Sequence, residues 1–107
     1  MTELNTATDV VYVDPDFADL VPGFLENRRA EIDIIRSASD EGDFQEIKRL
    51  GHGMKGAGAG YGFPVITDIG KNLEDAAIKE DAAAIESELK RLGEYLSAVR
   101  VEIEPES

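Results

Sequence analysis

Residues 50–62 read LGHGMKGAGAGYG, a stretch in which six of thirteen residues are glycine and none is acidic. It also holds the only histidine of the chain, His52. Each glycine inside a helix costs about 0.5 to 1 kcal/mol relative to alanine. Six of them would destabilise a helix unless another group must approach its backbone closely. We therefore interpret this stretch as a contact surface.

Apolar residues recur every three or four positions through this stretch and beyond it, which is the period of an amphipathic helix. This helix is expected to follow Asp43, which forms a capping-box-like start with Glu46, and to close at Gly62. Its buried stripe consists of Ile47, Leu50, Met54, Ala57 and Tyr61. A further helix is expected from Pro64, and its inward-facing residues are Val65, Ile66, Ile69, Leu73, Ala76 and Ala77.

Two more amphipathic segments flank this pair. Asp14 is expected to cap a helix that starts at Pro15 and runs to about Ser39. Pro22 either kinks this helix or divides it into a short helix and a longer one. Another helix is expected after Asp81, with apolar residues in a seven-residue pattern at Ala82, Ile85, Leu89, Leu92, Leu96 and Val99. Four such helices with short connections predict an all-α fold, an antiparallel four-helix bundle.

The two ends of the chain have a different pattern. Val10–Val13 is a short β-prone run, so the bundle should carry a short N-terminal extended segment or an extra helix. The segment Val99–Glu104 alternates like a strand, and it either pairs with Val10–Val13 or prolongs the last helix. We predict a single domain over residues 1–107, with 1–13 as an N-terminal segment, 14–101 as the helical bundle and 102–107 as a tail.

Charge and composition exclude several classes of function. The formal net charge is -12 and the pI about 4.3, so the overall field repels nucleic acid and anionic membrane surfaces. The chain has no cysteine, which excludes disulfides and cysteine metal sites, and a single histidine does not suffice for a zinc cluster. No secretory signal or membrane-spanning stretch is recognisable. We expect a cytoplasmic monomer without a metal site of its own.

The face around His52 is expected to be exposed and basic. At about 100° per residue, His52 lies about 160° around the helix from Met54, so its ring should face water. The same face holds Lys48, Lys55, Gly56 and Ala59, with Gln45 and Arg49 at its edges. No acidic residue occurs between Glu46 and Asp68, so this face should attract a phosphoryl group or an acidic protein pocket. The alternative is a solvated face without a role, which leaves the glycines unexplained.

Glu74 is a candidate partner for His52. If the two central helices form a hairpin centred near Phe63, each of the two residues lies eleven positions from that centre. Equal rise per residue then places them at one level. Glu74 would accept a hydrogen bond from one ring nitrogen of His52, which fixes the tautomer and leaves the other nitrogen as a nucleophile. The alternative is a surface carboxylate without a histidine contact, and the position of Glu74 alone leaves both open.

Three sequence features occur in a fixed order: HGMKGAG at residues 52–58, Gly62-Phe63, and the group Leu73, Glu74, Ala76 and Ala77. Through these features the chain resembles the histidine-containing phosphotransfer (HPt) domain of bacterial multistep phosphorelays, and the resemblance covers nearly all of residues 14–99. The resemblance implies that His52 is the phosphoacceptor, that Lys55 steadies the phosphoryl oxygens and that Gly56 leaves a gap for the partner. Glu74 matches the carboxylate that orients the imidazole in the phosphotransfer domain of chemotaxis histidine kinases. Gly58 and Gly60 depart from the family, where alanine, serine or threonine is more usual.

The resemblance implies a phosphocarrier and not an autonomous enzyme. His52 would exchange a phosphoryl group reversibly with the aspartate of receiver domains, one in a hybrid histidine kinase and one in a response regulator. The chain would bind no cofactor, and Mg²⁺ would come from the receiver. A second hypothesis is a helical adaptor that binds a partner through the glycine-rich face without phosphorylation. A histidine kinase fragment is a third, but the sequence contains no ATP-binding module.

Overall fold

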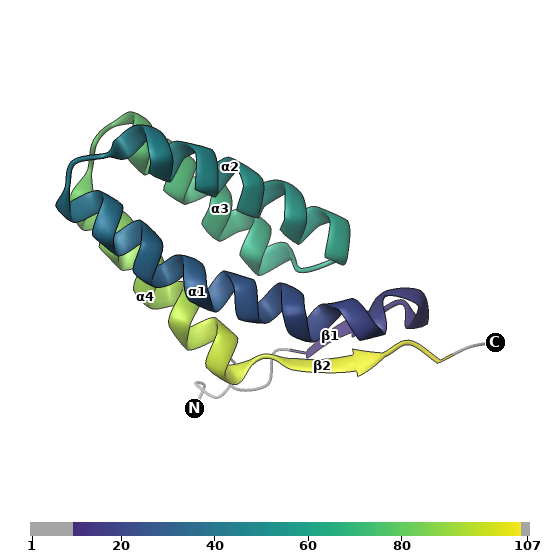
Figure 1. The fold of residues 1–107 in the computed structure, drawn as a ribbon. Coiled ribbons are helices and arrows are strands. Elements are labelled where there is room, and N and C mark those ends of the chain that lie inside the picture. Colours follow the sequence, from purple (N-terminus) through teal and green to yellow (C-terminus); the bar gives the residue numbers. More distant parts are fainter. Residues whose placement is uncertain (1–9, 106–107) are drawn as a thin grey trace, which may run out of the picture.

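The apolar periodicity of the chain produces four α-helices in the computed structural model, which describes residues 10–105. They are α1 (Val21–Asp40), α2 (Phe44–Tyr61), α3 (Pro64–Ile78) and α4 (Ala82–Ala98). The chain reverses direction at each short connection, so that the helices form an antiparallel bundle (Figure 1). The predicted all-α four-helix bundle is confirmed. Within the described residues, no helix combines the length and the hydropathy needed to cross a membrane.

The helix ends follow the local signals in the sequence. The Asp43 carboxylate accepts a hydrogen bond from the Glu46 amide at 3.2 Å, and the Asp81 carboxylate accepts one from the Ala84 amide at 3.0 Å. Both therefore cap amides that have no partner within their own helix. Gly62 ends α2 in a left-handed conformation with φ of +85°, which a residue with a Cβ atom adopts only with strain.

Pro22 divides the N-terminal helical region into two parts. A 3-10 helix, η2 (Pro15–Leu20), precedes α1 and is capped by Asp14, whose carboxylate accepts a hydrogen bond from the Asp16 amide at 2.8 Å. Pro22 is the second residue of α1, where its missing N–H leaves no helical hydrogen bond unmade. Of the two alternatives, the short helix followed by a longer one is the one observed.

The core lies between the four helices. Its fully buried large side chains are Phe63, Ile35, Ile47, Met54, Ile66, Ile69, Leu73, Ile85, Leu89 and Leu92. On α2 the buried stripe includes Gly51 and Gly58, whereas the predicted Leu50, Ala57 and Tyr61 are only partly buried. On α3 Val65 is also only partly buried. On α4 Ala82 is exposed, and Tyr95 is buried besides the predicted Ile85, Leu89, Leu92 and Leu96. The predicted Val99 follows the end of α4 and is only partly buried.

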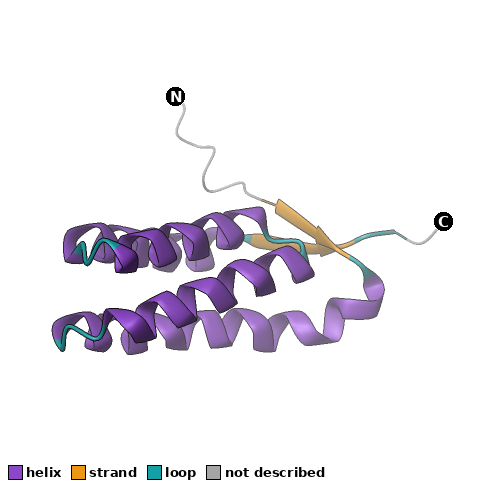
Figure 2. Cartoon of the chain, turned by 90° about the horizontal axis from the view of Figure 1, so that it is seen from above, coloured by secondary structure: helices purple, strands orange, loops and turns teal. Residues whose placement is uncertain are grey.

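The N- and C-terminal segments meet in a two-stranded sheet beside one end of the bundle (Figure 2). Strand β1 (Val10–Val13) pairs in parallel with β2 (Arg100–Ile103), with Val10 opposite Arg100 and Val13 opposite Ile103. The C-terminal segment therefore pairs with the N-terminal one and does not prolong α4. The last helix ends at Ala98, before the expected limit of the helical part at residue 101. Residues 1–9 and 106–107 of the two predicted terminal segments lie outside the described residues.

Candidate functional site

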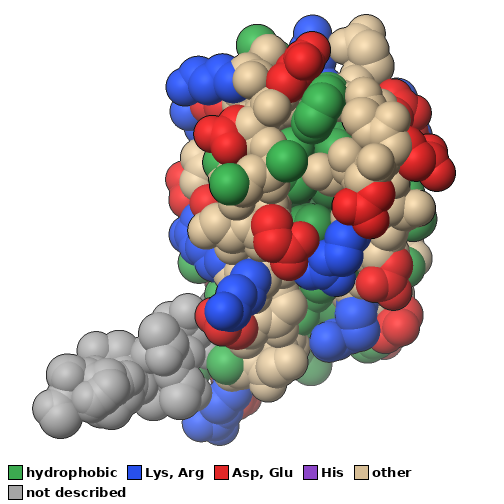
Figure 3. All heavy atoms as spheres, turned by 90° about the vertical axis from the view of Figure 1, so that its left-hand side faces the viewer, with side chains coloured by type: hydrophobic (Ala, Val, Ile, Leu, Met, Phe, Trp, Pro, Cys, Tyr) green, Lys and Arg blue, Asp and Glu red, His purple; other side chains and the backbone are tan. Residues whose placement is uncertain are grey.

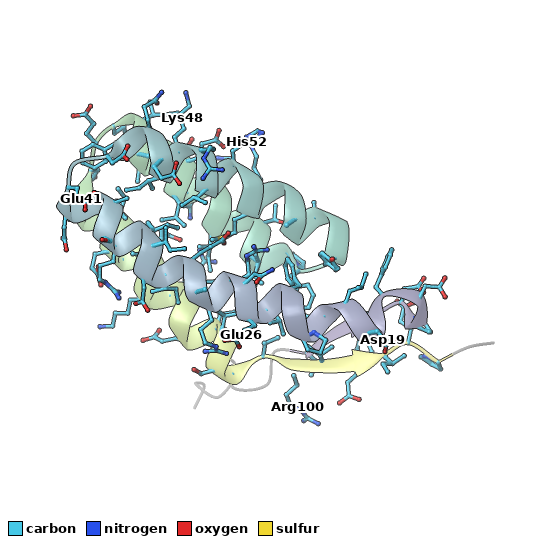
Figure 4. The ribbon with its side chains drawn as sticks, viewed as in Figure 1. Asp19, Glu26, Glu41, Lys48, His52 and Arg100 are labelled. Carbon is cyan, nitrogen blue, oxygen red and sulfur yellow. The ribbon has the colours of Figure 1, made fainter. Side chains whose placement is uncertain are left out.

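His52 points away from the core. It lies on α2 between the buried residues Gly51 and Met54, and its side chain is 68% exposed. Figure 4 shows His52 and Lys48 projecting from the same outer side of α2. The helical periodicity of α2, which buries Met54, therefore forces the imidazole into solvent, as the sequence predicts.

One carboxylate from α3 binds two groups of α2. Glu74 Oε2 lies 3.2 Å from His52 Nδ1, and Glu74 Oε1 accepts a hydrogen bond from Lys55 Nζ at 3.1 Å. The Glu74 side chain is only 17% exposed, because it lies between the two helices, whereas that of Lys55 is 38% exposed. We call His52, Lys55 and Glu74 the site cluster. Of the two alternatives for Glu74, the structure has the one with the histidine contact.

The electrostatics of the site cluster define the state of the imidazole. The hydrogen bond from Lys55 holds the pKa of the Glu74 carboxyl below its ordinary range, with smaller contributions from the charges of Lys55 and His52. An ionised carboxylate only accepts hydrogen bonds, so the proton of a neutral His52 ring must be on Nδ1. Nε2 then carries the lone pair, and no described residue forms a hydrogen bond with this nitrogen.

The surface around the site cluster is less basic than the sequence suggests. Arg49 pairs with Glu46 at 2.5 Å, and this hydrogen bond lowers the pKa of the Glu46 carboxyl. Lys55 is paired with Glu74, so Lys48 is the cation of this face without an ion pair among the described residues. On the adjoining end of the bundle, basic and acidic side chains are intermingled (Figure 3). The gap in acidic residues between Glu46 and Asp68 exists in the sequence but not in space, because Glu74 fills it from α3.

The structure brings together most of the residues that the sequence assigned to this surface. A shallow hollow is lined by Gln45, Lys48, Arg49, His52 and Glu74. Gly56 lies one turn further along α2, and apart from its chain neighbours and the nearby backbone of α2 no atom lies within 4 Å of where its Cβ would be. Ala59 borders a separate hollow at the α2–α3 turn. The hollow therefore lies on one side of His52 and an open strip of backbone on the other.

Sequence reasoning missed the inner role of two glycines in the stretch at residues 50–62. Gly51 and Gly58 face α3 and are buried, so the group that approaches their backbone belongs to this chain and not to a partner. The interpretation as an external contact surface stays a prediction for glycines with open space, such as Gly53 and Gly60. The helical period was the available signal, because it places Gly51 and Gly58 on the same side as Ile47 and Met54.

Comparison with known proteins gives one finding for this chain. A family model described as the Hpt domain matches residues 19–102, which include all four helices. Neither the curated proteins nor the solved structures give a match. Within the described residues, no group of three or more histidine, aspartate or glutamate side chains is arranged to hold a metal ion.

Proposed function

The chain belongs to the Hpt domain family, whose members transfer phosphoryl groups through a histidine in phosphorelays, and we propose that His52 is the residue that carries the group here. It would accept the group from the aspartate of one receiver domain and donate it to the aspartate of another. A single observation supports this assignment best. The exposed imidazole of His52 is held at Nδ1 by Glu74, which leaves Nε2 directed to solvent as a nucleophile.

The transfer step follows from this geometry. The Nε2 lone pair attacks the phosphorus of an aspartyl phosphate, the N–P bond forms, and the P–O bond to the aspartate breaks so that its carboxylate leaves. The imidazole becomes positively charged while its Nδ1 proton stays in place. Glu74 accepts a hydrogen bond from that proton, and its negative charge stabilises the ring charge as it develops. The step is reversible, because the same contacts stabilise attack by a carboxylate on the phosphoimidazole.

Lys55 has two tasks in this proposal. Its ammonium group has three donors, of which one already binds Glu74. The remaining donors would bind oxygens of the phosphoryl group, because Lys55 lies nearly one helical turn after His52 on the same face. Phosphoryl transfer depends mainly on positioning and charge neutralisation. The chain would therefore supply a nucleophile and a cation, and Mg²⁺ would come with the receiver.

The docking surface is proposed to extend along the exposed side of α2. Gln45, Lys48 and Arg49 border the hollow beside His52, and Lys48 offers a cation to the acidic pocket of a receiver. On the other side, Gly56 and Ala59 are exposed and have small side chains or none. A receiver can therefore approach the backbone there without displacing side chains.

The proposal is tested by incubating the protein with receiver domains phosphorylated by radiolabelled acetyl phosphate and Mg²⁺. We expect an acid-labile phosphoryl adduct on the parent and none on His52→Gln, which should keep the melting temperature because the side chain is exposed. ATP and Mg²⁺ without a kinase should give no label. Label on folded His52→Gln would contradict the assignment. Receiver binding without any label on the parent would favour the adaptor hypothesis.

A further inference from the structure

Glycines on both α2 and α3 are in direct contact with the backbone of the opposite helix. A Cβ atom on Gly51 would lie 2.8 Å from the amide nitrogen of Glu74 and 2.9 Å from the carbonyl oxygen of Gly70. A Cβ atom on Gly70 would lie 2.5 Å from the amide nitrogen of Lys55 and 2.7 Å from the carbonyl oxygen of Gly51. These separations are shorter than non-bonded contact allows. A larger residue at either position must therefore push the two backbones apart.

The two contacts are reciprocal. In an α-helix the carbonyl of residue i accepts a hydrogen bond from the amide of residue i+4. One turn of α2 therefore runs from Gly51 to Lys55, and one turn of α3 runs from Gly70 to Glu74. Each glycine packs against the turn that begins with the other glycine. These two turns carry all three members of the site cluster.

The remaining glycines of α2 provide an internal comparison. Gly53, Gly56 and Gly60 have no atom within 4 Å of a Cβ position, so larger residues fit there. Gly58 is also tightly packed, since its Cβ would lie 2.6 Å from Thr67 Oγ1 and 2.7 Å from the Thr67 amide nitrogen. The three nearest atoms all belong to Thr67 and none to the site cluster. Gly58 therefore has the same kind of close contact with α3 as Gly51, but it lies outside the two turns that carry the site cluster.

We propose that Gly51 and Gly70 are positioning residues, whose reciprocal contact sets the helix separation at which Glu74 reaches both His52 Nδ1 and Lys55 Nζ. The two distances of 3.2 and 3.1 Å lie at the upper end of the hydrogen-bond range. Moving α3 away from α2 by the size of a methyl group breaks one of the contacts or both. The consequence for phosphoryl transfer rests on the proposed function, whereas the consequence for the Glu74 carboxylate does not.

The test compares Gly51→Ala and Gly70→Ala with the parent in the full chain. NMR of the Glu74 carboxyl carbon through an acid titration reports its hydrogen bond with Lys55. The ring nitrogens of His52 report which nitrogen carries the proton. In both variants we expect Glu74 to titrate at a higher pH than in the parent. The His52 ring should change from one tautomer to a mixture, and phosphoryl transfer should slow.

Two control variants separate positioning from general packing. Gly58→Ala should lower the melting temperature without moving the Glu74 or His52 signals, because its clash lies at Thr67. Gly60→Ala should move neither the signals nor the transfer rate. Unchanged signals in folded Gly51→Ala and Gly70→Ala would overturn the proposal, and so would equal shifts in Gly58→Ala. If the NMR signals shift in Gly51→Ala and Gly70→Ala but the parent protein accepts no phosphoryl group, the proposed function is rejected and the positioning role is supported.

Glu74→Asp is a second test, which does not require the glycine variants to fold. It shortens the side chain by one C–C bond, about 1.5 Å, while the helices stay as they are. If the glycine contact fixes the separation, the shorter carboxylate loses His52 or Lys55. We then expect the His52 ring to lose its single tautomer or the carboxyl to lose its low titration midpoint. A variant that keeps both properties would mean that the separation is not limiting, and would overturn the proposal.

Discussion

At the scale of single residues, the chemistry of the site depends on one carboxylate that does two things. Glu74 fixes the orientation of the His52 ring through Nδ1, and it holds the ammonium group of Lys55 close to the same ring. If Glu74 were replaced by a neutral acceptor, the ring would keep a hydrogen bond but lose the charge that stabilises its phosphorylated form. The charge of Glu74 therefore matters as much as its position.

Lys55→Met should raise the pKa of the Glu74 carboxyl toward its ordinary value of 4.5, because the hydrogen bond from Lys55 is the main cause of its low value. A carboxyl whose folded pKa is lowered stabilises the fold above its unfolded pKa, and this stabilisation is lost as the pH falls through the folded value. The difference in melting temperature between parent and variant should therefore shrink below pH 4.5. Carboxyl NMR and thermal unfolding across this range measure both effects.

The same Lys55→Met variant should transfer phosphoryl groups about tenfold more slowly, which corresponds to one charge-assisted hydrogen bond of about 1.5 kcal/mol. Lys71→Met is the matched control, since Lys71 pairs with Asp75 on α3 at 3.3 Å and forms no hydrogen bond or ion pair with a member of the site cluster. Lys71→Met should leave both the Glu74 titration and the transfer rate unchanged. A Lys55→Met protein with the parent's rate would remove Lys55 from the mechanism.

At the scale of helices, the sequence predicts boundaries better than it predicts helix–helix contacts. The caps at Asp43 and Asp81 and the closing Gly62 are local signals, and each is found where the sequence places it. The inward role of Gly51 and Gly58 depends on how close α3 comes. Helical period gives the direction in which a glycine faces, but not whether a backbone lies against it. For that reason the composition of residues 50–62 predicts contact with another molecule, whereas two of its glycines, Gly51 and Gly58, contact α3 of the same chain.

Asp81→Ala should lower the free energy of unfolding by about 1 kcal/mol, because it removes the side-chain acceptor for the Ala84 amide at the start of α4. Thermal or denaturant unfolding measures this change. Glu94→Ala is the control on the same helix, since Glu94 is exposed and such changes stay within about 0.5 kcal/mol. Both variants should transfer phosphoryl groups at the parent's rate, because α4 contributes no residue to the site cluster. Equal stability of the two variants would mean that the Asp81 cap contributes nothing.

At the scale of the whole molecule, the site and the terminal strands occupy separate parts of the bundle. The site cluster lies on α2 and α3, whereas β1 and β2 lie beside α1 and the end of α4 (Figure 1). The alternation in residues 99–104 indicated a strand, but alternation alone does not name a partner or a direction. The pairing follows from the three-dimensional course of the chain, because the bundle brings its two ends to the same side. Parallel pairing follows from the directions in which the two segments then run.

Val13→Ala should therefore weaken the fold without changing the chemistry of His52. Val13 is 2% exposed and belongs to the core, whereas Tyr12 beside it on β1 is 60% exposed. Removing buried methyl groups lowers the free energy of unfolding by about 1 to 3 kcal/mol, so the melting temperature should fall by several degrees. Tyr12→Ala, the control on the same strand, should change stability by no more than about 0.5 kcal/mol.

In both β1 variants the Glu74 titration and the transfer rate should match the parent at temperatures where the protein is folded, because β1 lies beside α1 and the end of α4 and not beside the site cluster (Figure 1). Equal melting temperatures for Val13→Ala and Tyr12→Ala would mean that β1 does not pack on the bundle as the structure has it. A changed Glu74 titration in folded Val13→Ala would mean that the strand pair and the site are coupled. The strands then would be part of what holds α2 and α3 at their working separation, and Gly51 and Gly70 would not set it alone.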